Sequence, residues 1–473
     1  MDAHGPGETT EDGFPALLHR AYEHALDWRA SVARRPVFPS VTPDQLRGVL
    51  GAGGLSEDGE DASETLDALA RAGELGATGS AGPRYFGYVI GSSLPVAAAA
   101  DWLVTAWDQN TTLYSCGPAV AVLEDICAEW LVDLLGLHGH TSVGFTTGTQ
   151  MAAFTGLAAA RHQLLAAAGW DVETDGLWQA PRIPVIVSEQ RHASIDRALR
   201  FLGMGTSVHT LACDAEGAVE LPALAAALES VEGPPIVCVQ AGNINTGAVD
   251  PLAEVCERVH ARDGWVHVDG AIGLWALASD QHRRQLEGAH LADSLTTDAH
   301  KWLNTPFDCG IVLVAHPAAH RAAVGVAADY LEASEQRDQI NTVPDWSRRA
   351  RSVPVYAALR TLGRSGVSRL VDRNVELARR MAARLAAEPG VEIVNDVVLN
   401  QVLVRFEAPH RARDALTKEV IRRVQQDGVC WLSGSHFAGR RVMRVSVCSW
   451  LTTPGDIDRS AEEIIRRFRD ACS

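Results

Sequence analysis

The chain has 473 residues, of which 47% are hydrophobic and 21% are charged, and its formal net charge is −17 at pH 7. This composition is ordinary for a soluble globular protein with more than one domain. The acidic excess argues against a nucleic-acid partner, because binding a phosphate backbone relies on clustered Lys and Arg.

Residues 1–82 are predicted to form an N-terminal helical segment. Apolar residues in 14–33 recur at helical spacing, and Thr42 followed by Pro43 is typical of a helix start. The stretch 51–82 is rich in Gly, Asp, Glu and Ala, and we expect a loop or a loosely packed pair of helices there.

Residues 83–366 are predicted to form a large α/β domain. The apolar run 94–107 at its start contains Asp101 and is shorter than the roughly 20 residues that cross a bilayer, so we expect no membrane span. Further on, short β-branched runs alternate with Ala- and Leu-rich helical stretches, which indicates a mainly parallel sheet with helices on both faces. The predicted strands are 184–188, 207–211, 235–240, 265–268, 294–297 and 311–314.

Residues 367–473 are predicted to form a small C-terminal α+β domain. Its helices and strands alternate in a different pattern from that of the preceding region. The predicted elements are a helix at 367–387, strands at 391–393 and 400–406, a helix at 412–426, a strand at 441–447 and a last helix from 454.

The cysteines and the first residues of the chain indicate in which cellular compartment the protein works. Residues 1–13 lack the succession of basic, apolar and small residues that is typical of a secretory signal. The nine cysteines are scattered, odd in number and without a CxxC pair. We therefore expect a cytoplasmic protein with buried thiols, and neither a metal site nor a disulfide framework.

Four short segments carry candidate chemistry, and the first is Phe-Thr-Thr-Gly-Thr-Gln at 145–150, before a predicted helix. Thr147, Gly148 and Thr149 leave backbone N–H groups at a helix start, where a phosphate is favoured. A plain helix cap explains the same residues without a ligand. The second segment, 189–195, follows a predicted strand and contains His192, whose ring could stack on a planar ligand. A capping or buried histidine is the alternative.

The third segment, 265–271, ends a predicted strand with Asp269. Open α/β sheets gather ligands at the carboxyl ends of their strands, and a carboxylate there could keep a pyridine nitrogen protonated. A strand-end cap is the alternative.

The fourth segment is Thr-Thr-Asp-Ala-His-Lys-Trp at 296–302, directly after a predicted strand. Of the 42 basic residues, only Lys301 and Lys418 are lysines. An amine that attacks an aldehyde must be able to lose its proton, which arginine does not do in proteins, so Lys301 is the candidate nucleophile. A surface lysine or chance survival in an arginine-rich chain is the alternative.

Taken together and in this order, the four segments resemble those of the group II decarboxylases that depend on pyridoxal 5′-phosphate (PLP), the family of aromatic-L-amino-acid, glutamate and histidine decarboxylases. The resemblance covers the chain from about residue 38 to the C-terminal strand. It implies the aspartate-aminotransferase type of fold (PLP-dependent transferase fold type I), with a mainly parallel seven-stranded sheet. It also implies a homodimer in which the N-terminal helical segment wraps around the partner and both chains build each active site.

The resemblance also implies cofactor contacts. Lys301 matches the family's Schiff-base lysine, Asp269 the partner of the pyridine nitrogen, and Ala271 the small residue against the ring. His192 matches the histidine that stacks on the cofactor. Thr147, Gly148 and Thr149 match the phosphate-binding turn, with His300 close by, and Asn243 falls where the family has a polar residue near the cofactor.

Two further matches concern the substrate and the product. Arg444 resembles an arginine of the C-terminal domain that receives a substrate carboxylate. Tyr330 is the candidate for the tyrosine of a mobile loop that returns a proton to Cα, and a packing tyrosine is the alternative. This chain departs from the family's Asn-Pro-His-Lys motif, because it has Asp298-Ala299-His300-Lys301 at that place.

We therefore expect decarboxylation of an L-amino acid to an amine and CO2. The cofactor also supports Cα–Cβ cleavage by a lyase or aldolase, transamination and oxidative deamination, so these remain alternatives. A non-catalytic protein that has kept the fold is a further alternative, against which Lys301, Asp269 and His192 argue.

Overall fold

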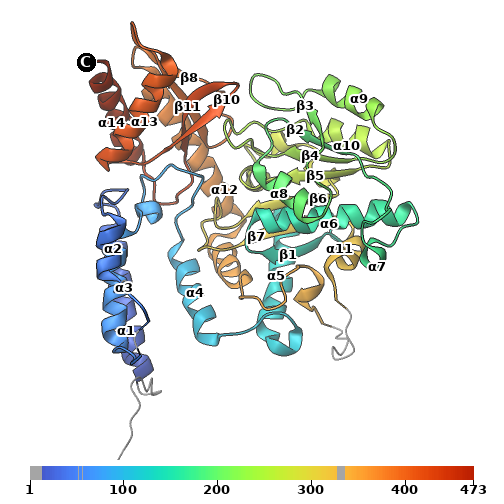
Figure 1. Ribbon diagram of the computed structural model, residues 1–473, viewed down its shortest axis with the longest axis horizontal. Coiled ribbons are helices and arrows are strands. Elements are labelled where there is room, and N and C mark those ends of the chain that lie inside the picture. Colours follow the sequence, from blue (N-terminus) through green and yellow to red (C-terminus); the bar gives the residue numbers. More distant parts are fainter. Residues whose placement is uncertain (1–12, 52, 56, 327–335) are drawn as a thin grey trace, which may run out of the picture.

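The computed structural model describes residues 13–51, 53–55, 57–326 and 336–473. The described chain contains a seven-stranded sheet, a separate four-stranded sheet and an N-terminal group of helices (Figure 1). None of its helices is both long and apolar enough to cross a membrane.

The large sheet has the strand order β1-β7-β6-β5-β4-β2-β3. Only β7 runs antiparallel to its neighbours, so the sheet is mainly parallel, as predicted. The strands are β1 (Ser142–Thr146), β2 (Val185–Ser188), β3 (His209–Leu211), β4 (Ile236–Gln240), β5 (Trp265–Asp269), β6 (Ser294–Asp298) and β7 (Gly310–Val314).

Helices pack on both faces of this sheet because successive side chains of a strand point to opposite sides. In β2, Val185 and Val187 pack in the core formed with α6 (Thr149–Ala167) and α8 (Ala193–Phe201). Ile186 lies in the other core. That core also includes residues of α5 (Pro118–Leu135), α9 (Leu221–Ser230), α10 (Leu252–His260) and the first part of α12 (Ser352–Ala386).

The C-terminal region forms an antiparallel sheet of order β10-β11-β9-β8, with helices packed against it. Figure 1 shows it beside the upper end of the N-terminal helices. Its elements are β8 (Val391–Ile393), β9 (Gln401–Phe406), α13 (Arg413–Asp427), β10 (Ser433–Phe437), β11 (Arg440–Ser446) and α14 (Pro454–Cys472).

The N-terminal segment contains α1 (Phe14–Ser31), α2 (Pro43–Val49) and α3 (Ala62–Gly76). The predicted helix start is confirmed, because the Thr42 side chain and Gln45 form a reciprocal capping box. The stretch 51–82 contains one long helix rather than a pair. Helix α4 (Pro95–Trp107) follows and leads into the large sheet.

The sequence prediction missed two strands and misplaced one helix start. Strands β1 and β10 were not among the predicted runs. Helix α12 begins at Ser352 rather than at 367, and it is kinked at Gly363, where φ is +60°. It crosses the domain boundary predicted at residue 366, which stays a prediction. The remaining described helices are α7 (Val172–Asp175) and α11 (Pro317–Val324), together with several short helical turns.

Candidate active site

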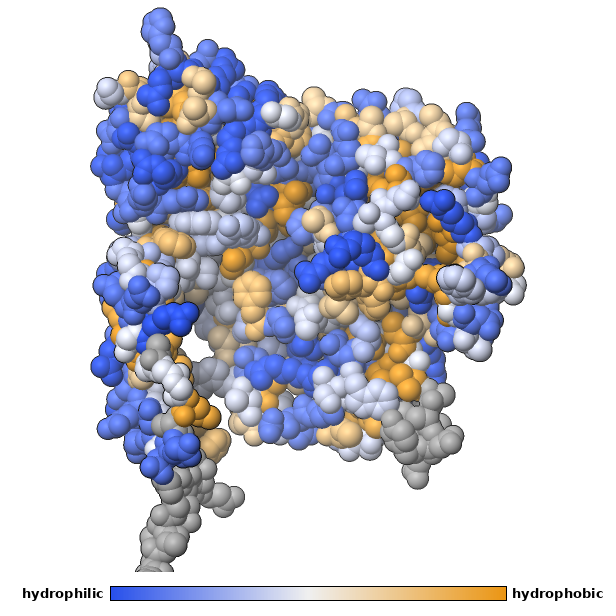
Figure 2. All heavy atoms as spheres, viewed as in Figure 1, coloured by the Kyte–Doolittle hydropathy of each residue, from blue (hydrophilic) through white to orange (hydrophobic). Residues whose placement is uncertain are grey.

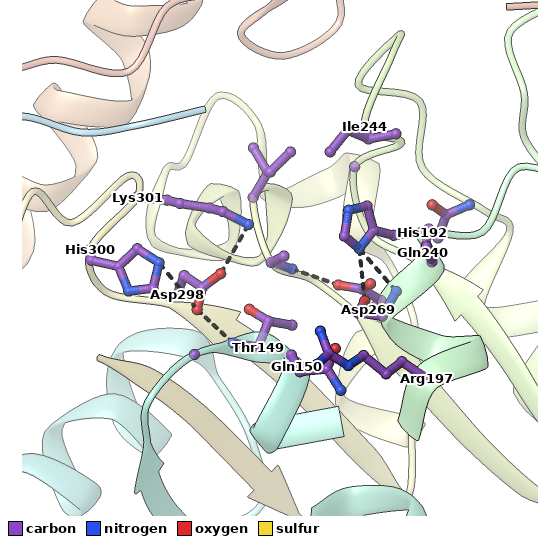
Figure 3. A pocket seen from close by; sticks show the side chains of 16 residues that line it. Thr149, Gln150, His192, Arg197, Gln240, Ile244, Asp269, Asp298, His300 and Lys301 are labelled. Carbon is purple, nitrogen blue, oxygen red and sulfur yellow. Dashed lines mark hydrogen bonds and ion pairs between the residues drawn. The ribbon is translucent and has the colours of Figure 1, made fainter. Parts of the chain in front are cut away.

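A cavity of about 390 Å³ opens at the carboxyl ends of three neighbouring strands (Figure 3). Strands β4, β5 and β6 end at Gln240, Asp269 and Asp298, and Gln240 lies beside Asp269 in the sheet register. Parallel strands present these ends at one edge of the sheet, which is where ligands bind in open α/β sheets. The cavity is lined by Gly148, Thr149, Gln150, His192, Ala193, Ser194, Arg197, Gln240, Gly242, Ile244, Asp269, Ala271, Ile272, Asp298, His300 and Lys301.

Lys301 lies just after β6, and its amine is held by a carboxylate. Its Nζ is 2.9 Å from Oδ2 of Asp298, and the side chain is 17% exposed. The other oxygen, Asp298 Oδ1, accepts a hydrogen bond of 2.7 Å from the backbone N–H of Thr149 at the start of α6. One buried carboxylate therefore joins the candidate nucleophile to the candidate phosphate turn.

The charge of Asp298 is maintained despite burial. Burial acts to raise the pKa of this carboxyl, but the positive charges of Lys301 and His300 and the hydrogen bonds from Thr149 and Lys301 outweigh it, so the net shift is downward. His300 Nδ1 accepts from the backbone N–H of Cys309 at 3.1 Å, and its Nε2 lies 3.7 Å from Asp298 Oδ1.

Asp269 lies on the floor of the cavity at the end of β5 and is buried. Its Oδ1 accepts a 3.1 Å hydrogen bond from the backbone N–H of Ala271. Burial raises the pKa of Asp269, and the backbone hydrogen bond and the charges of Lys301 and His192 only partly oppose the rise. A cationic group bound in the cavity would stabilise the ionised carboxylate.

His192 lines the cavity and also caps a helix. Its Nδ1 accepts the backbone N–H of Ser194 at 3.3 Å at the start of α8, and it lies 2.8 Å from the Ser194 hydroxyl. Desolvation by the surrounding protein is the main influence on the pKa of the ring and lowers it. The negative charge of Asp269 opposes this shift, and the positive charges of Lys301 and Arg444 add to it. A neutral imidazole is therefore favoured, and its exposed side is available to a ligand.

The turn at 147–149 is shaped by a close backbone contact. A Cβ at Gly310 of β7 would lie 2.3 Å from the carbonyl carbon of Gly148, so glycine is required there. This contact fixes the turn against the sheet. Gly148 and Thr149 line the cavity, whereas Thr147 is not among its lining residues.

Of the remaining predicted residues, one lines the cavity and another lies just behind its lining. Ala271 lines it. The buried Asn243 uses its Oδ1 to accept the backbone N–H groups of Asn245 and Thr246, at 2.8 and 3.3 Å, and its chain neighbour Ile244 lines the cavity instead.

Arg444, on β11, is buried and donates a 3.3 Å hydrogen bond to the carbonyl of Ile244. Its Nε has no partner among the described residues. Burial lowers the pKa of this guanidinium. Tyr330 lies outside the described residues.

Sequence reasoning assigned no role to several lining residues, among them Gln150, Arg197, Gln240 and Asp298. Gln240 had a usable signal, since it is a polar residue at the end of a β-branched run, like Asp269. Arg197 had only its helical spacing from His192, one and a half turns along α8. For Asp298 the sequence offered one signal, its replacement of the Asn that the family has at this position.

The cavity fits the expected cofactor, which carries a phosphate and a basic pyridine nitrogen. Thr149 Oγ1, Gln150 Nε2 and Gln240 Nε2 are buried and have no hydrogen-bond partner within the described chain. Two of these atoms lie on the first residues of α6, where an anion is favoured. Asp269 supplies the buried carboxylate that a protonated ring nitrogen requires.

Comparisons with known proteins agree with this fit. Residues 55–407 match the model of the pyridoxal-dependent decarboxylase conserved domain. An aromatic-L-amino-acid decarboxylase from Bacillus atrophaeus is 28% identical over 92% of each chain. A tyrosine decarboxylase from Oryza sativa subsp. japonica is 30% identical over 93% of this chain and 88% of its own.

The fold also agrees. The crystal structure of an Oryza sativa TDC with PLP and tryptamine superposes with a TM-score of 0.91, at 23% identity, over 99% of this chain and 100% of that one. The chain therefore belongs to the group II PLP-dependent decarboxylases and is a carboxy-lyase that uses this cofactor.

Proposed function

We propose that the cavity at the ends of β4, β5 and β6 is the active site in which this enzyme decarboxylates an L-amino acid. The observation that carries the proposal is the convergence of Lys301, Asp269 and the 148–149 turn on one cavity. Relatives named for aromatic amino acids make L-tyrosine and L-tryptophan the first substrates to test.

We propose that Lys301 holds the cofactor covalently through its amine. When bound, PLP supplies an electron-poor pyridine ring that takes up the electrons left by the departing carboxylate. Asp269 is the buried carboxylate that keeps the ring nitrogen protonated. Gly148 and Thr149 present hydrogen-bond donors to the phosphate, with Thr147 before them in the same turn and His300 close by. Ala271 leaves room for the ring, and Asn243 orders the turn that contains Ile244.

His192 and Arg444 orient the substrate in this proposal. The His192 ring lies over the cavity, and its neutral form leaves the face of the cofactor free of added charge. Arg444 has an Nε without a partner among the described residues and supplies a positive charge next to the lining residue Ile244, where a substrate carboxylate would bind. Which bond breaks depends on this orientation. Tyr330 is proposed to return the proton to Cα.

The first test uses the two lysines of the chain. We expect a visible absorbance band from the purified protein with PLP, and after borohydride reduction the fixed cofactor should map to the peptide containing Lys301. Lys301→Ala should lose the band and at least roughly 10³-fold of the CO2 release, as expected for removal of a covalent catalyst. Lys418→Ala, on the exposed face of α13, is the matched control and should keep both.

The products decide the reaction. Equal amounts of amine and CO2 would support decarboxylation. An α-keto acid or an aldehyde without CO2 would contradict it and return transamination or Cα–Cβ cleavage to consideration. Fixation of the cofactor elsewhere than Lys301 would contradict the assignment of the site.

We further propose that the enzyme is a cytoplasmic homodimer with the boundaries 1–82, 83–366 and 367–473. Nine cysteines without a disulfide suit a reducing compartment. Helix α1 presents a stripe of exposed apolar residues, Phe14, Leu18, Tyr22 and Leu26, each 44–56% exposed and spaced by one helical turn. Apolar side chains border the hollow between the N-terminal helices and the main body (Figure 2). A second copy of the chain would cover this α1 stripe.

A further inference from the structure

Asp298 makes the same two contacts that the cofactor requires. Its Oδ1 accepts the backbone N–H of Thr149 at 2.7 Å, and its Oδ2 lies 2.9 Å from Nζ of Lys301. Figure 3 shows the carboxylate between the amine and the start of α6. A phosphate bound at the turn would use that N–H, and an aldehyde would bond to that amine.

The backbone of Asp298 is fixed beside the cavity. Asp298 is 3% exposed, and its backbone carbonyl accepts the indole N–H of Trp275 at 3.1 Å. Asp298 also pairs with Gly310 where β6 and β7 run side by side. The backbone is therefore fixed, and the carboxylate can leave its two partners only by rotation of the side chain.

The charged groups around Asp298 come from three elements. Lys301 and His300 follow β6, His192 begins α8, and Asp269 ends β5. Lys301 is the cation in direct contact, and a dianionic phosphate at the turn would bring a second anion close to this carboxylate. Two negative charges close together in a buried site repel each other strongly.

We propose that Asp298 is an internal competitor of the cofactor: its carboxylate occupies the phosphate turn and pairs with the Lys301 amine in the cofactor-free enzyme, and it must yield both contacts when PLP binds. The inference rests on the proposed roles of Lys301 and of the 147–149 turn. Asp298 thereby stabilises the empty site, since it neutralises Lys301 and satisfies the first N–H of α6, and it lowers the affinity for the cofactor.

The test is Asp298→Asn, which has the same size and restores the residue that the family carries at this position. An amide keeps an oxygen for the Thr149 N–H, gains a donor toward a phosphate and removes the negative charge. We expect PLP to bind at least roughly tenfold more tightly than to the native enzyme, as judged from the absorbance of the bound cofactor. Asp298→Ala should also bind more tightly, because it too removes the charge.

Two probes separate the two contacts. 4-Deoxypyridoxine 5′-phosphate has the phosphate without the aldehyde, and its dissociation constant, measured by calorimetry, should fall roughly tenfold in Asp298→Asn. Pyridoxal has the aldehyde without the phosphate, and borohydride should fix it on Lys301 faster in the variant, because the amine no longer has to leave its ion pair with the Asp298 carboxylate.

The outcomes distinguish this inference from the proposed function. If the native enzyme fixes PLP on Lys301 but Asp298→Asn binds 4-deoxypyridoxine 5′-phosphate no more tightly and fixes pyridoxal no faster, the competitor role is wrong and Asp298 is a ligand or a structural residue. A change with only one probe would overturn the role at the other contact. If the native enzyme fixes no PLP on Lys301, the proposed site fails and this inference fails with it.

Discussion

The cofactor domain and the N-terminal helices differ in how far they bury their apolar residues. Strands β4 to β7 are buried along their whole length. By contrast, α1, α2 and α3 contain no buried residue among those described. The first region therefore carries its own core, whereas the apolar side chains of the second stay largely exposed, with Tyr22 meeting the ring of Trp102 edge-on.

Ion pairs differ between the two regions in the same way. In the main body, Arg348 and Glu124 are both fully buried and 3.1 Å apart, and Arg348 also donates to the carbonyl of Phe145 on β1. In the N-terminal segment, Asp67 of α3 pairs with Arg20 and His24 of α1 in partly exposed positions. Buried pairs are costly to break, while exposed pairs contribute little.

The largest expected effect comes from the α1 stripe. Leu18→Glu combined with Tyr22→Glu should dissociate the dimer, because each apolar side chain buried at an interface contributes about 1.5–3 kcal/mol and each carboxylate adds a desolvation cost. Light scattering after size exclusion measures the mass. Leu55→Glu, at a fully exposed leucine outside the stripe, is the control and should leave the mass unchanged. A native enzyme that is monomeric at micromolar concentration would contradict the dimer.

The next effect concerns the core. Arg348→Met should destabilise the fold by about 3 kcal/mol, since it removes the closer of the two cations that pair with the buried Glu124 and leaves only Arg337, at 3.6 Å. Urea unfolding followed by circular dichroism measures the loss. Asp67→Asn is the matched substitution in the exposed pair, and it should change the midpoint little and less still at high salt. Equal losses from both variants would mean that the N-terminal helices are as well buried as the main body.

Much of this fold was predictable because its signals are local. Strands β2, β4, β5 and β7 are short β-branched runs, and the sequence placed them within a residue or two. Strand β1 was missed because Gly144 interrupts its pattern, and that glycine is required by a non-local contact: a Cβ there would lie 2.3 Å from the carbonyl oxygen of Thr342. Strand β10, Ser-Gly-Ser-His-Phe, has no apolar alternation to recognise.

The candidate site was predictable to a similar extent. Lys301, Asp269 and His192 follow strands, so their approximate meeting place follows from the topology of a parallel sheet. The contact of Asp298 with Thr149 joins residues 149 positions apart. It depends on how α6 starts against β6, and no local pattern encodes that.

The smallest expected effect is the pH dependence of the core. Burial lowers the pKa of His267 on β5 and of His320 on α11 to about 4. An unfolded histidine has a pKa of about 6.5, so between these values the unfolded chain binds more protons and the native state loses stability as the pH falls. Each histidine should contribute a loss of up to about 1.4 kcal/mol for every pH unit in this window.

His320→Gln should flatten the fall of the unfolding free energy between pH 6.5 and 4.5, whatever its effect at pH 7, because glutamine does not titrate. His19→Gln on α1, where the native side chain is 71% exposed, should leave the slope unchanged. The slope, rather than the absolute stability, is the quantity to compare, since it reports burial of the imidazole and not the loss of its hydrogen bond to Ser142. A slope that responds to His19 as strongly as to His320 would place α1 in a buried interface of the native enzyme and would tie the two regions into one cooperative unit.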